Sequence, residues 1–306
     1  NILRHKGSAV LESYKNYNNH FGVPYMLLNL RPHYEHAVLE CGASGPFEIQ
    51  PLAELICPNV AAITNIYPVH LSGFGSVETI ARTKGALFES LPTSGLAVLP
   101  ANSPFETLWL NQIGNANKLT FGLSSNADVY ADNIKYYANK TTAIIKTPFG
   151  HMEIDISLPG EAMLLNVLAA IAILSPCKLS DDFLISAISR LTTFANRFDF
   201  KEGFRKGLVI IDDCYNANPM AMKMAADLLI LQSGYHVAII GDMYELGNAQ
   251  QSVKAHSDLG VMFRQKGIKQ LFAVGDFAKH AVESFGENGF WFASKKELLY
   301  FVLQEL

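Results

Sequence analysis

Short apolar runs alternate with helix-like segments in the first hundred residues. HAVLE (36–40), NVAAITNI (59–66) and LAVLP (96–100) have the length and aliphatic composition of buried strands. We expect helices between them, at 47–56 and 76–91. Because apolar strands that alternate with helices usually form a parallel sheet covered on both faces, this pattern predicts an α/β domain.

Residues 126–157 follow a different pattern. VYADNIKYY, TTAIIKT and HMEIDISL are short, alternate partly between apolar and polar positions, and are separated by turn signals at Asn139-Lys140 and Phe149-Gly150. The pattern predicts a small antiparallel excursion from the parallel sheet. Helices are expected after it, at about 162–175 and 180–190.

A second α/β unit is predicted from about residue 207. GLVIIDD, YHVAIIGD, QLFAVGD and GFWFA are four expected strands, each followed by a helix-like segment. Residues 219–232 form one such helix, and their apolar positions recur at the spacing of a single helical face. That face comprises Met222, Ala225, Ala226, Leu229 and Ile230. We therefore expect an open doubly wound domain, connected to the first by TTFANRFDFKEG (192–203).

Polar residues follow directly after the first strand of this second unit. DDCYNANP (212–219) comes after the apolar run 208–211. Carboxylates at the end of a buried strand cost free energy unless they have partners. Asn218 followed by proline matches an N-cap and the first residue of a helix. Capping leaves Asp213 and its neighbours unexplained.

Composition narrows the possible functions. The chain has 306 residues, which predicts about two domains, and 49% hydrophobic with 17% charged residues is typical of a globular protein. The formal charge of −4 and the lack of a Lys/Arg-rich block argue against nucleic acid as a partner. The four cysteines have no metal-type spacing and fit reduced thiols of a cytosolic protein. They are Cys41, Cys57, Cys177 and Cys214.

No apolar stretch has the length of a membrane span, and no signal peptide is visible. We therefore expect a cytoplasmic protein without membrane insertion. The chain starts with Asn1 instead of Met, and its last expected helix runs to Leu306. From these two features we expect the sequence to be a piece of a longer chain.

Candidate metal ligands follow two of the first strands. Glu40 ends one expected strand, Asn65 ends the next, and His70 comes five residues later. Ligands of open parallel sheets bind beyond the carboxyl ends of strands, and we expect these strand ends to be adjacent. Glu and His are ligands for divalent cations, and Glu is the better partner for Mg²⁺. Surface or capping roles are the simpler alternative for each residue taken singly.

Lys84 occupies an unusual position in its helix. The segment VETIARTKGALFESL carries one apolar stripe, and Lys84 falls inside that stripe. The stripe comprises Val77, Ile80, Ala81, Leu87, Phe88 and Leu91. A buried lysine is costly unless it is paired, neutralised or modified. Two alternatives stay open, a lysine whose ammonium reaches water and a lysine with a lowered pKa or a carbamate.

The segment NNHFGVP (18–24) gathers three polar side chains before an apolar run. It fits turn chemistry, with Gly22 and Pro24 setting the backbone. It also fits a contact with a polar substrate.

Six segments, taken in order, resemble the Mur ligases of bacterial cell-wall synthesis. They are NNHFGVP, ECGA, TNIYPVHLSGFGS, TKGALFE, DDCYNANP and GDMYELG. The resemblance extends over nearly the whole chain and is closest to the branch that adds D-alanyl-D-alanine to UDP-N-acetylmuramoyl-tripeptide. It implies a central ATP-binding domain over 1–195 and a Rossmann-like C-terminal ligase domain over 196–306, each incomplete at its outer end.

The resemblance implies ligation through an acyl phosphate. ATP phosphorylates the terminal carboxylate of the tripeptide, the amine of D-alanyl-D-alanine attacks, and phosphate leaves. Two Mg²⁺ ions offset the phosphate charge. By this resemblance Glu40, His70 and Lys84 are the catalytic residues and metal ligands, with Lys84 acting as a carbamate.

Further roles come from the same resemblance. The residues expected to contact ATP are Asn166, Arg197, Asp213 and Asn216. Asn19 and His20 are expected near the muramoyl-peptide, and Tyr215 and Asn218 near the nucleotide and the incoming dipeptide. The residues expected on the dipeptide side are Asp242, Glu245 and His256. Simpler alternatives remain for two of them, with His256 as a surface residue of a helix and Glu245 as a helix cap.

The chain also departs from the family pattern. Ala162-Met163 stand where the family carries His-Asn near the nucleotide, and Asn196 stands where it usually has Gly. The Gly-Lys-Thr phosphate loop is expected just before Asn1, and without it the chain should not turn over ATP. The uridine-binding N-terminal domain and the last C-terminal strand are also expected outside the sequence.

The leading hypothesis is a monomeric ATP-dependent amide ligase. A non-catalytic relative that keeps the fold for binding is one alternative, and a sister ligase acting on glutamates or folate-like substrates is another. A dinucleotide dehydrogenase fits poorly, because no GxGxxG follows any expected strand.

Overall fold

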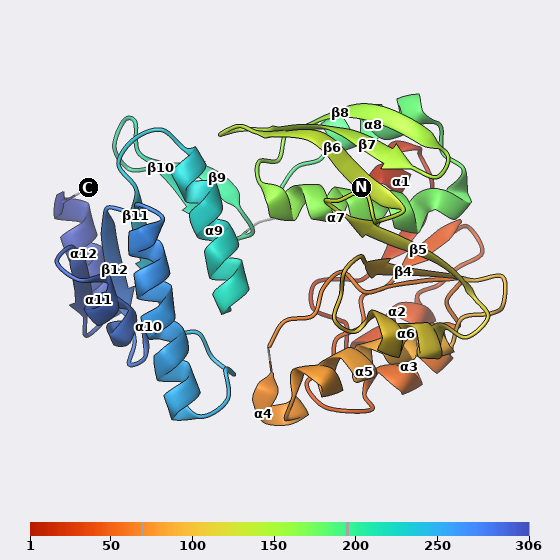
Figure 1. Ribbon diagram of the computed structural model, residues 1–306, viewed down its shortest axis with the longest axis horizontal. Helices are drawn as coiled ribbons and strands as arrows, with labels where there is room; N and C mark the ends of the chain where they lie inside the picture. Colours follow the sequence, from red (N-terminus) through yellow and green to blue (C-terminus); the bar gives the residue numbers. More distant parts are fainter. Residues whose placement is uncertain (69, 194–195, 306) are drawn as a thin grey trace. The chain divides into compact units, whose positions relative to one another are not determined.

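A computed structural model of the chain describes residues 1–68, 70–193 and 196–305. They form two compact units (Figure 1). Unit 1 comprises Asn1–Lys135, Lys140–Ser157 and Ala162–Leu191. The described residues of unit 2 lie within Tyr136–Asn139, Leu158–Glu161 and Thr192–Leu306.

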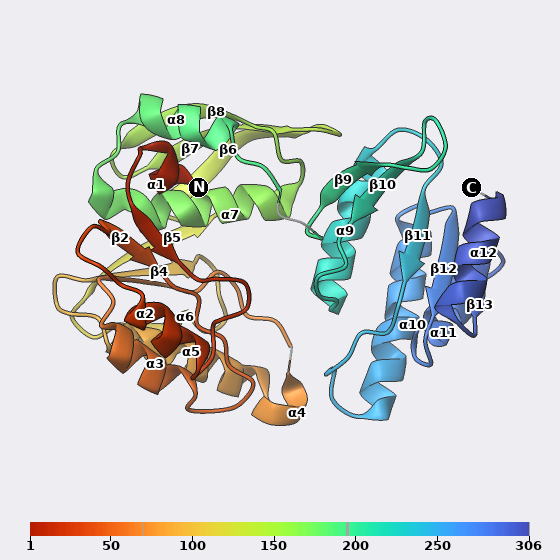
Figure 2. The same cartoon turned by 180° about the vertical axis from the view of Figure 1, so that it is seen from behind.

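Unit 1 is an α/β structure built largely from residues 1–191 (Figure 2). Its strands are β1 (Val10–Glu12), β2 (His36–Val38), β3 (Val60–Ala62), β4 (Leu96–Pro100), β5 (Asn117–Gly122), β6 (Val129–Tyr136), β7 (Thr141–Thr147) and β8 (Gly150–Ile156). Its helices are α1 (Ile2–His5), α2 (Gly22–Leu28), α3 (Ile49–Ile56), α4 (Leu71–Phe74), α5 (Val77–Glu89), α6 (Glu106–Ile113), α7 (Glu161–Leu174) and α8 (Asp181–Ser189), with a 3₁₀ turn η1 (Ser175–Cys177).

The main sheet of unit 1 has the strand order β3-β4-β5-β6-β7-β8. Neighbouring strands from β3 to β6 are parallel, and β7 pairs antiparallel with β8. The expected antiparallel segment is therefore present, but as a continuation of the same sheet. The sequence pattern missed β5, because Asn117 and Lys118 are exposed polar residues that shorten its apolar run.

Strand β2 differs from the prediction. It pairs in parallel with β1 in a separate two-stranded sheet, with Val10 opposite His36, and not with β3. The expectation that Glu40 and Asn65 end neighbouring strands of one sheet is therefore wrong. Both strands are also shorter than their apolar runs, because β2 ends at Val38 and β3 ends at Ala62.

Helices α5 and α6 cover one face of the parallel strands. Alternate residues of β3 and β4, including Ala97 and Leu99, pack against Phe88 of α5 and Trp109 of α6. Trp109 is completely buried, and its Nε1–H donates to the backbone oxygen of Ala81 at 2.9 Å. This hydrogen bond fixes α6 to α5 one turn before Lys84. It also satisfies the polar end of a buried indole.

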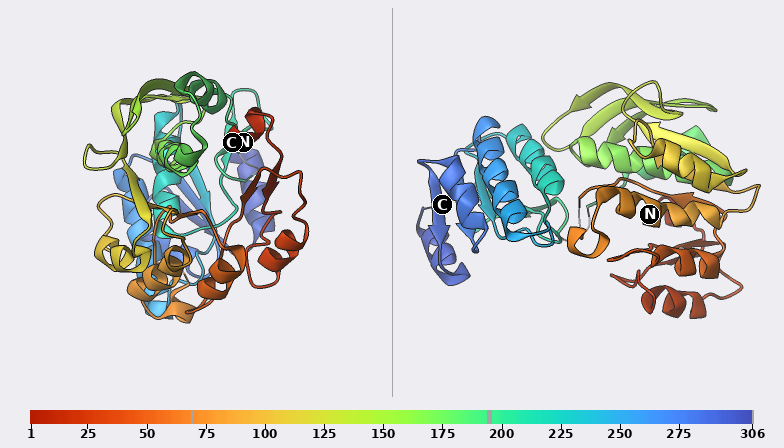
Figure 3. Two further views of the ribbon diagram at one scale, coloured as in Figure 1. Left: turned by 90° about the vertical axis from the view of Figure 1, so that its right-hand side faces the viewer. Right: turned by 60° about the horizontal axis from the view of Figure 1, so that its bottom comes forward.

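Unit 2 contains a parallel sheet and a separate strand pair (Figure 3). Its strands are β9 (Asp199–Glu202), β10 (Val209–Asp212), β11 (Val237–Ile240), β12 (Gln270–Val274) and β13 (Gly289–Phe292). Its helices are α9 (Pro219–Leu231), α10 (Ala249–Gln265), α11 (Ala278–Phe285) and α12 (Lys295–Glu305). The order β11-β12-β13 is parallel throughout.

The first expected strand of this unit has another partner than predicted. In the described residues β10 pairs antiparallel with β9, not with β11, so the parallel sheet has three strands where four were expected. Strand β9 lies within 192–203, which the sequence pattern predicted as a connector. An ion pair between Lys201 and Asp212 joins the two strands. The charged residues of DFKE hid this strand from the hydrophobic pattern.

Both faces of the three-stranded sheet are covered by helices. Leu271 and Ala273 of β12 belong to a core that also includes residues of α10 and α11. Phe272, between them in sequence, points to the other face, where its ring meets Phe301 of α12 at 5.5 Å. The two-residue alternation of β12 thus produces two packed layers.

Helix α9 follows the prediction with a shift. Ala226 is buried, and Met222 and Leu229 pack on the core as expected. Leu228 is also buried although the stripe omitted it, and Ile230 is 36% exposed.

Candidate functional site

Glu40 is held by the segment that precedes α2. Asn18 Nδ2 donates to Glu40 Oε1 at 3.2 Å, and the backbone N–H of Glu40 donates to Ser13 Oγ at 2.8 Å. The N–H of Gly42 donates to the backbone oxygen of Asn18 at 2.7 Å. NNHFGVP and ECGA, two segments singled out from the sequence, are therefore in direct contact. Asn18 was not among the predicted site residues, although it belongs to the same polar run.

Asn19 and His20 have different environments. Asn19 Oδ1 accepts hydrogen bonds from the N–H groups of Phe21 and Gly22, at 3.1 and 2.9 Å, at the start of α2. The side chain of Asn19 therefore holds the backbone turn that leads into α2. His20 is exposed, and its ring lies 4.2 Å from the ring of Phe21, which is 75% exposed.

Helix α4 packs closely on the loop that follows Glu40. A Cβ atom on Gly73 would lie 2.0 Å from the backbone oxygen of Ser44, so only glycine fits there. His70 is the N-cap residue of α4 and has a left-handed backbone, with φ of 53°. The backbone contact thus fixes α4, which follows His70, against the loop that follows Glu40.

This close approach supports a direct test. Gly73→Ala should push α4 away from Ser44 and shift His70. If His70 has the catalytic role that the resemblance to the Mur ligases implies, activity should fall at least about tenfold, since a 1 Å misplacement of a catalytic group can cost about 10². Steady-state rates of the polypeptide that carries this chain would measure this. Ser72→Ala, at the neighbouring exposed position, is the control. Unchanged rates in Gly73→Ala would show that this contact does not position the site.

Lys84 lies on α5, whose first turn is capped by Ser76. Its side chain is mostly buried, and burial lowers its pKa from the ordinary value of 10.5, while the negative charge of Glu40 opposes that shift. The two side chains are therefore close enough to interact electrostatically. Burial also raises the pKa of the neighbouring Cys41 thiol to about 11, with Glu40 adding to the effect, so this cysteine is protonated at neutral pH.

The predicted metal ligands are not a cluster of common ligand types. In the described part of the chain, no three His, Cys, Asp or Glu side chains form a group that could hold a metal ion. The predicted set contains two such side chains, Glu40 and His70, and its third member is Lys84. A protonated lysine has no free lone pair and cannot be a ligand, so this set needs the amine to lose its proton or to be modified.

Asn166 is exposed on α7. Ala162 and Met163, one turn earlier, are half-buried on the same helix.

Three predicted residues of unit 2 form one cluster. The guanidinium of Arg197 lies over the ring of Tyr215, 4.2 Å from its centroid. The N–H of Tyr215 donates to the backbone oxygen of Asn196 at 3.1 Å, and the N–H of Phe198 donates to Asp213 Oδ1 at 3.3 Å. These contacts join the segment before β9 to the segment after β10.

Asp213 is partly buried, directly after the end of β10. Burial raises its pKa from the ordinary value of 3.8, while the Phe198 N–H and the charge of Arg197 act in the opposite direction and Asp212 adds to the rise. Asp212, next to it, has a lowered pKa, because it accepts hydrogen bonds from Cys214 and Lys201. The two adjacent carboxylates thus have opposite environments.

Asn218 has the capping role that the sequence predicted. Its Oδ1 accepts from the N–H groups of Met220 and Ala221, at 3.1 and 2.9 Å, and Pro219 is the first helical residue of α9. The side chain of Asn216 accepts from the N–H of Ala217 at 2.8 Å and is exposed.

Asp242 is engaged with the backbone of another segment. Its two carboxylate oxygens accept from the N–H groups of Asp276, Phe277 and Ala278 at 3.1, 3.0 and 2.7 Å, at the start of α11. The positive end of the helix dipole also stabilises a carboxylate at this position. Glu245, three residues later, is exposed and has a left-handed backbone, with φ of 62°.

His256 is completely buried in α10. The idea that it is a surface residue of its helix is therefore wrong. Its Nε2 lies 2.9 Å from the N–H of Met243 and its Nδ1 lies 2.7 Å from the backbone oxygen of Ser252. Burial lowers the pKa of His256, which keeps the ring neutral. Leu259 and Phe263 follow at helical spacing on the same buried face of α10, but the polar Ser252 on that face hides the pattern.

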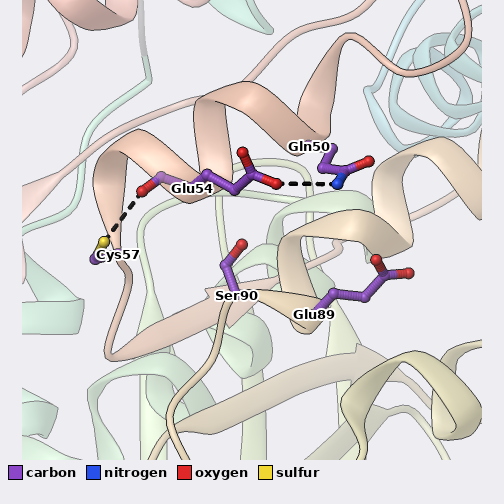
Figure 4. A pocket seen from close by; sticks show the side chains of 5 residues that line it. All are labelled: Gln50, Glu54, Cys57, Glu89 and Ser90. Atoms are coloured by element: carbon purple, nitrogen blue, oxygen red, sulfur yellow. Dashed lines mark hydrogen bonds between the residues drawn. The ribbon is translucent and has the colours of Figure 1, made fainter.

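A shallow hollow between α3 and the end of α5 contains none of the predicted residues (Figure 4). Its lining residues are Gln50, Glu54, Cys57, Glu89 and Ser90. The side-chain amide of Gln50 donates a hydrogen bond to the carboxylate of Glu54, as Figure 4 shows, so these two polar groups already have partners.

Comparisons with known proteins assign the fold to a family. A model described as "Mur ligase middle domain" matches residues 1–174, and one described as "Mur ligase, glutamate ligase domain" matches residues 196–306. The chain belongs to the Mur ligase family. As in other Mur ligases, a mostly parallel central sheet is followed by a C-terminal ligase domain.

Individual Mur ligases resemble the chain over most of its length. It is 33% identical over 285 residues to the UDP-N-acetylmuramoyl-tripeptide–D-alanyl-D-alanine ligase of Escherichia coli, covering 93% of this chain and 62% of the relative. A crystal structure of MurF from Acinetobacter baumannii superposes with a TM-score of 0.92 at 30% identity, covering 99% of this chain and 65% of that one. The chain thus spans less than two thirds of these relatives.

A third comparison concerns a nucleotide complex. MurF from Thermotoga maritima, crystallised with ADP, superposes with a TM-score of 0.86 at 25% identity, covering all of this chain and 69% of that one. In the described residues of the present Mur ligase, no helix has the length and apolar character needed to cross a bilayer.

Proposed function

We propose that the polypeptide carrying this chain is an ATP-dependent amide ligase of peptidoglycan precursor synthesis. It joins D-alanyl-D-alanine to UDP-N-acetylmuramoyl-tripeptide through an acyl phosphate. The observation that carries the proposal is the 33% identity, over 93% of the chain, to a ligase named for this reaction. The domain boundary at 195/196, a cytoplasmic location and a monomeric state belong to the same proposal.

In unit 1, Glu40, His70 and Lys84 would hold Mg²⁺, with Lys84 as a carbamate. The environment of Lys84 fits this role, because only a neutral amine reacts with CO₂ and burial lowers the pKa of this amine. The carbamate would place a second negative charge close to Glu40. Two neighbouring anions favour a bound cation. When bound, Mg²⁺ supplies charge neutralisation for the phosphates of ATP.

In unit 2, Asp213 and Arg197 would contact the nucleotide. Arg197 suits phosphate recognition, because its guanidinium is planar and always charged. Stacking on Tyr215 limits the orientations of that guanidinium before any nucleotide binds. Asn216 and, from unit 1, Asn166 are further nucleotide contacts in this proposal, and both are exposed.

The peptide contacts divide into two kinds. His20 and Tyr215 are exposed and can touch a substrate directly. The Oδ1 atoms of Asn19 and Asn218 accept from helix N-termini. We therefore propose that these two asparagines shape the binding segments and leave direct contact to their neighbours.

The decisive experiment is an assay of phosphate release with substrate omission. Phosphate release from ATP should require both D-alanyl-D-alanine and UDP-N-acetylmuramoyl-tripeptide, and mass spectrometry should detect the ligated peptide. Replacing the dipeptide by D-glutamate or by a folate with glutamate tests the sister-ligase alternative. Product formation only with such a substrate would overturn the proposal. Nucleotide binding without any ligation would favour a non-catalytic relative.

A further inference from the structure

His256 connects helix α10 to the loop that follows β11. The ring is completely buried, and its Nδ1–H donates to the backbone oxygen of Ser252 at 2.7 Å. That leaves Nε2 as the acceptor for the N–H of Met243 at 2.9 Å. Both hydrogen bonds can form only when the imidazole is neutral and its proton is on Nδ1.

Asp242 connects the same loop to α11. Its carboxylate accepts from three consecutive N–H groups, the last being that of Ala278. The ring of Phe277 is stacked on His256, with centroids 5.8 Å apart. A Cβ on Gly275 would lie 2.3 Å from Asp242 Oδ1, so glycine is needed for this close approach. The loop, α10 and α11 thus form one closed network.

The network leaves one large side chain of the loop in solvent. Met243 is completely buried and Leu246 is 7% exposed, so both ends of the short segment are anchored in the core. Tyr244 between them is 72% exposed. The backbone turns at Glu245 with φ of 62°, a conformation that costs free energy in residues other than glycine. The segment lies at the carboxyl end of a parallel strand, where ligands of such sheets bind.

We infer that Asp242 and His256 are positioning residues, and that the network they form holds Tyr244 in contact with the incoming dipeptide. This inference rests on the proposed ligase function and deepens it. It gives Asp242 and His256, which were predicted on the dipeptide side, a different role, because their polar atoms are hydrogen-bonded to the protein backbone. Tyr244, which no sequence pattern marked as a site residue, becomes the contact residue of this loop.

The first test is a pair of substitutions at His256. His256→Leu keeps a side chain of similar volume but removes the acceptor for the Met243 N–H. In His256→Gln the amide oxygen can replace Nε2 as that acceptor. We expect His256→Leu to raise the KM for D-alanyl-D-alanine by about tenfold, the effect of losing roughly one buried hydrogen bond. The KM for ATP should change less than about twofold. His256→Gln should restore most of the dipeptide KM.

A control separates positioning from general loss of stability. Leu259→Ala, in the same helix and the same core, removes buried apolar contacts but no partner of the loop. It should lower the melting temperature without changing the dipeptide KM. Hydrogen exchange gives a readout without catalysis, because the Met243 amide should be protected in the wild type and in Leu259→Ala but exposed in His256→Leu.

The pH profile is a second readout. The charged groups that act on His256 are Asp242, which raises its pKa, and His280 of α11, which lowers it, while burial lowers it most. The folded protein therefore resists protonation, and acidification below about pH 6.5 weakens the loop. The wild-type dipeptide KM should rise as the pH falls through the lowered pKa of His256, and that of His256→Gln should not.

Tyr244 tests the contact itself. Tyr244→Ala should raise the dipeptide KM by about tenfold, while the Met243 amide stays as protected from hydrogen exchange as in the wild type. Tyr244→Phe should retain most of the affinity if the ring provides the contact. A normal dipeptide KM in Tyr244→Ala would overturn the contact. A normal dipeptide KM in His256→Leu despite an exposed Met243 amide would overturn the positioning role. If the wild-type protein does not ligate, the proposed function is contradicted instead. The hydrogen-exchange result does not depend on ligation, so it still tests the positioning role.

Discussion

Lys84→Met is expected to reduce ligation by about 10²–10³-fold while unit 1 remains folded. The size of the loss is that of removing a group aimed at developing charge on a transferred phosphoryl group. Folding should not suffer, because the wild-type lysine is destabilising when charged. Burial lowers its pKa, so the unfolded chain binds the proton more tightly, and this cost is present at neutral pH. Methionine has similar length and no charge to desolvate.

Two further measurements separate the carbamate from a simple cation. Lys84→Arg keeps the positive charge but cannot form a carbamate, so it should be as inactive as Lys84→Met. Wild-type protein depleted of CO₂ should regain activity when bicarbonate is added. At a fixed concentration of dissolved CO₂ it should do so faster at pH 8.5 than at pH 7, since the neutral amine increases with pH up to the pKa. With ¹³C-labelled bicarbonate, NMR should detect one carbamate carbon that Lys84→Met lacks. An active Lys84→Arg would exclude the carbamate role.

Asp213→Ala is expected to raise the KM for ATP by about 10–100-fold. The substitution removes a partly buried carboxylate whose partners include the Phe198 N–H and the charge of Arg197. A lost hydrogen bond to a charged group costs roughly 1.5–3 kcal/mol, which corresponds to this range. Asp213→Asn keeps an acceptor for the N–H and should be intermediate. Initial rates at several ATP concentrations would measure both variants.

The neighbouring carboxylate provides a matched control. Asp212→Asn removes the ion pair with Lys201, whose side chain is 47% exposed, and ion pairs that reach solvent contribute about 0–1 kcal/mol. Its KM for ATP should stay within about threefold of the wild type. Equal effects at both positions would mean that the strand end is sensitive to any loss of charge, and Asp213 would have no specific role.

The sequence predicted best where a local rule determines the structure. The N-cap at Asn218 follows from one dipeptide, and the partial burial of Lys84 follows from the helical period. Strand β4 has the bounds that its apolar run predicted. In each of these cases, the neighbours along the chain carry the information.

Predictions failed where the partner lies in another segment of the chain. Strand β10 pairs with the charged β9, and β2 pairs with β1, which no hydrophobic pattern could indicate. His256 is buried because Met243 and Phe277 come from other segments. Pairing between segments is set by tertiary packing, which overrides local propensity.

The tryptophan whose indole is bonded to Ala81 gives unit 1 its own optical reporter. The sequence has two tryptophans, and the other, Trp291 of β13, is 39% exposed and lies in unit 2. An indole that is shielded from water fluoresces at shorter wavelength than one that is exposed to water, so the two emission bands should differ. Denaturant titrations followed at both wavelengths can therefore assign each cooperative transition to its own half of the polypeptide without added labels.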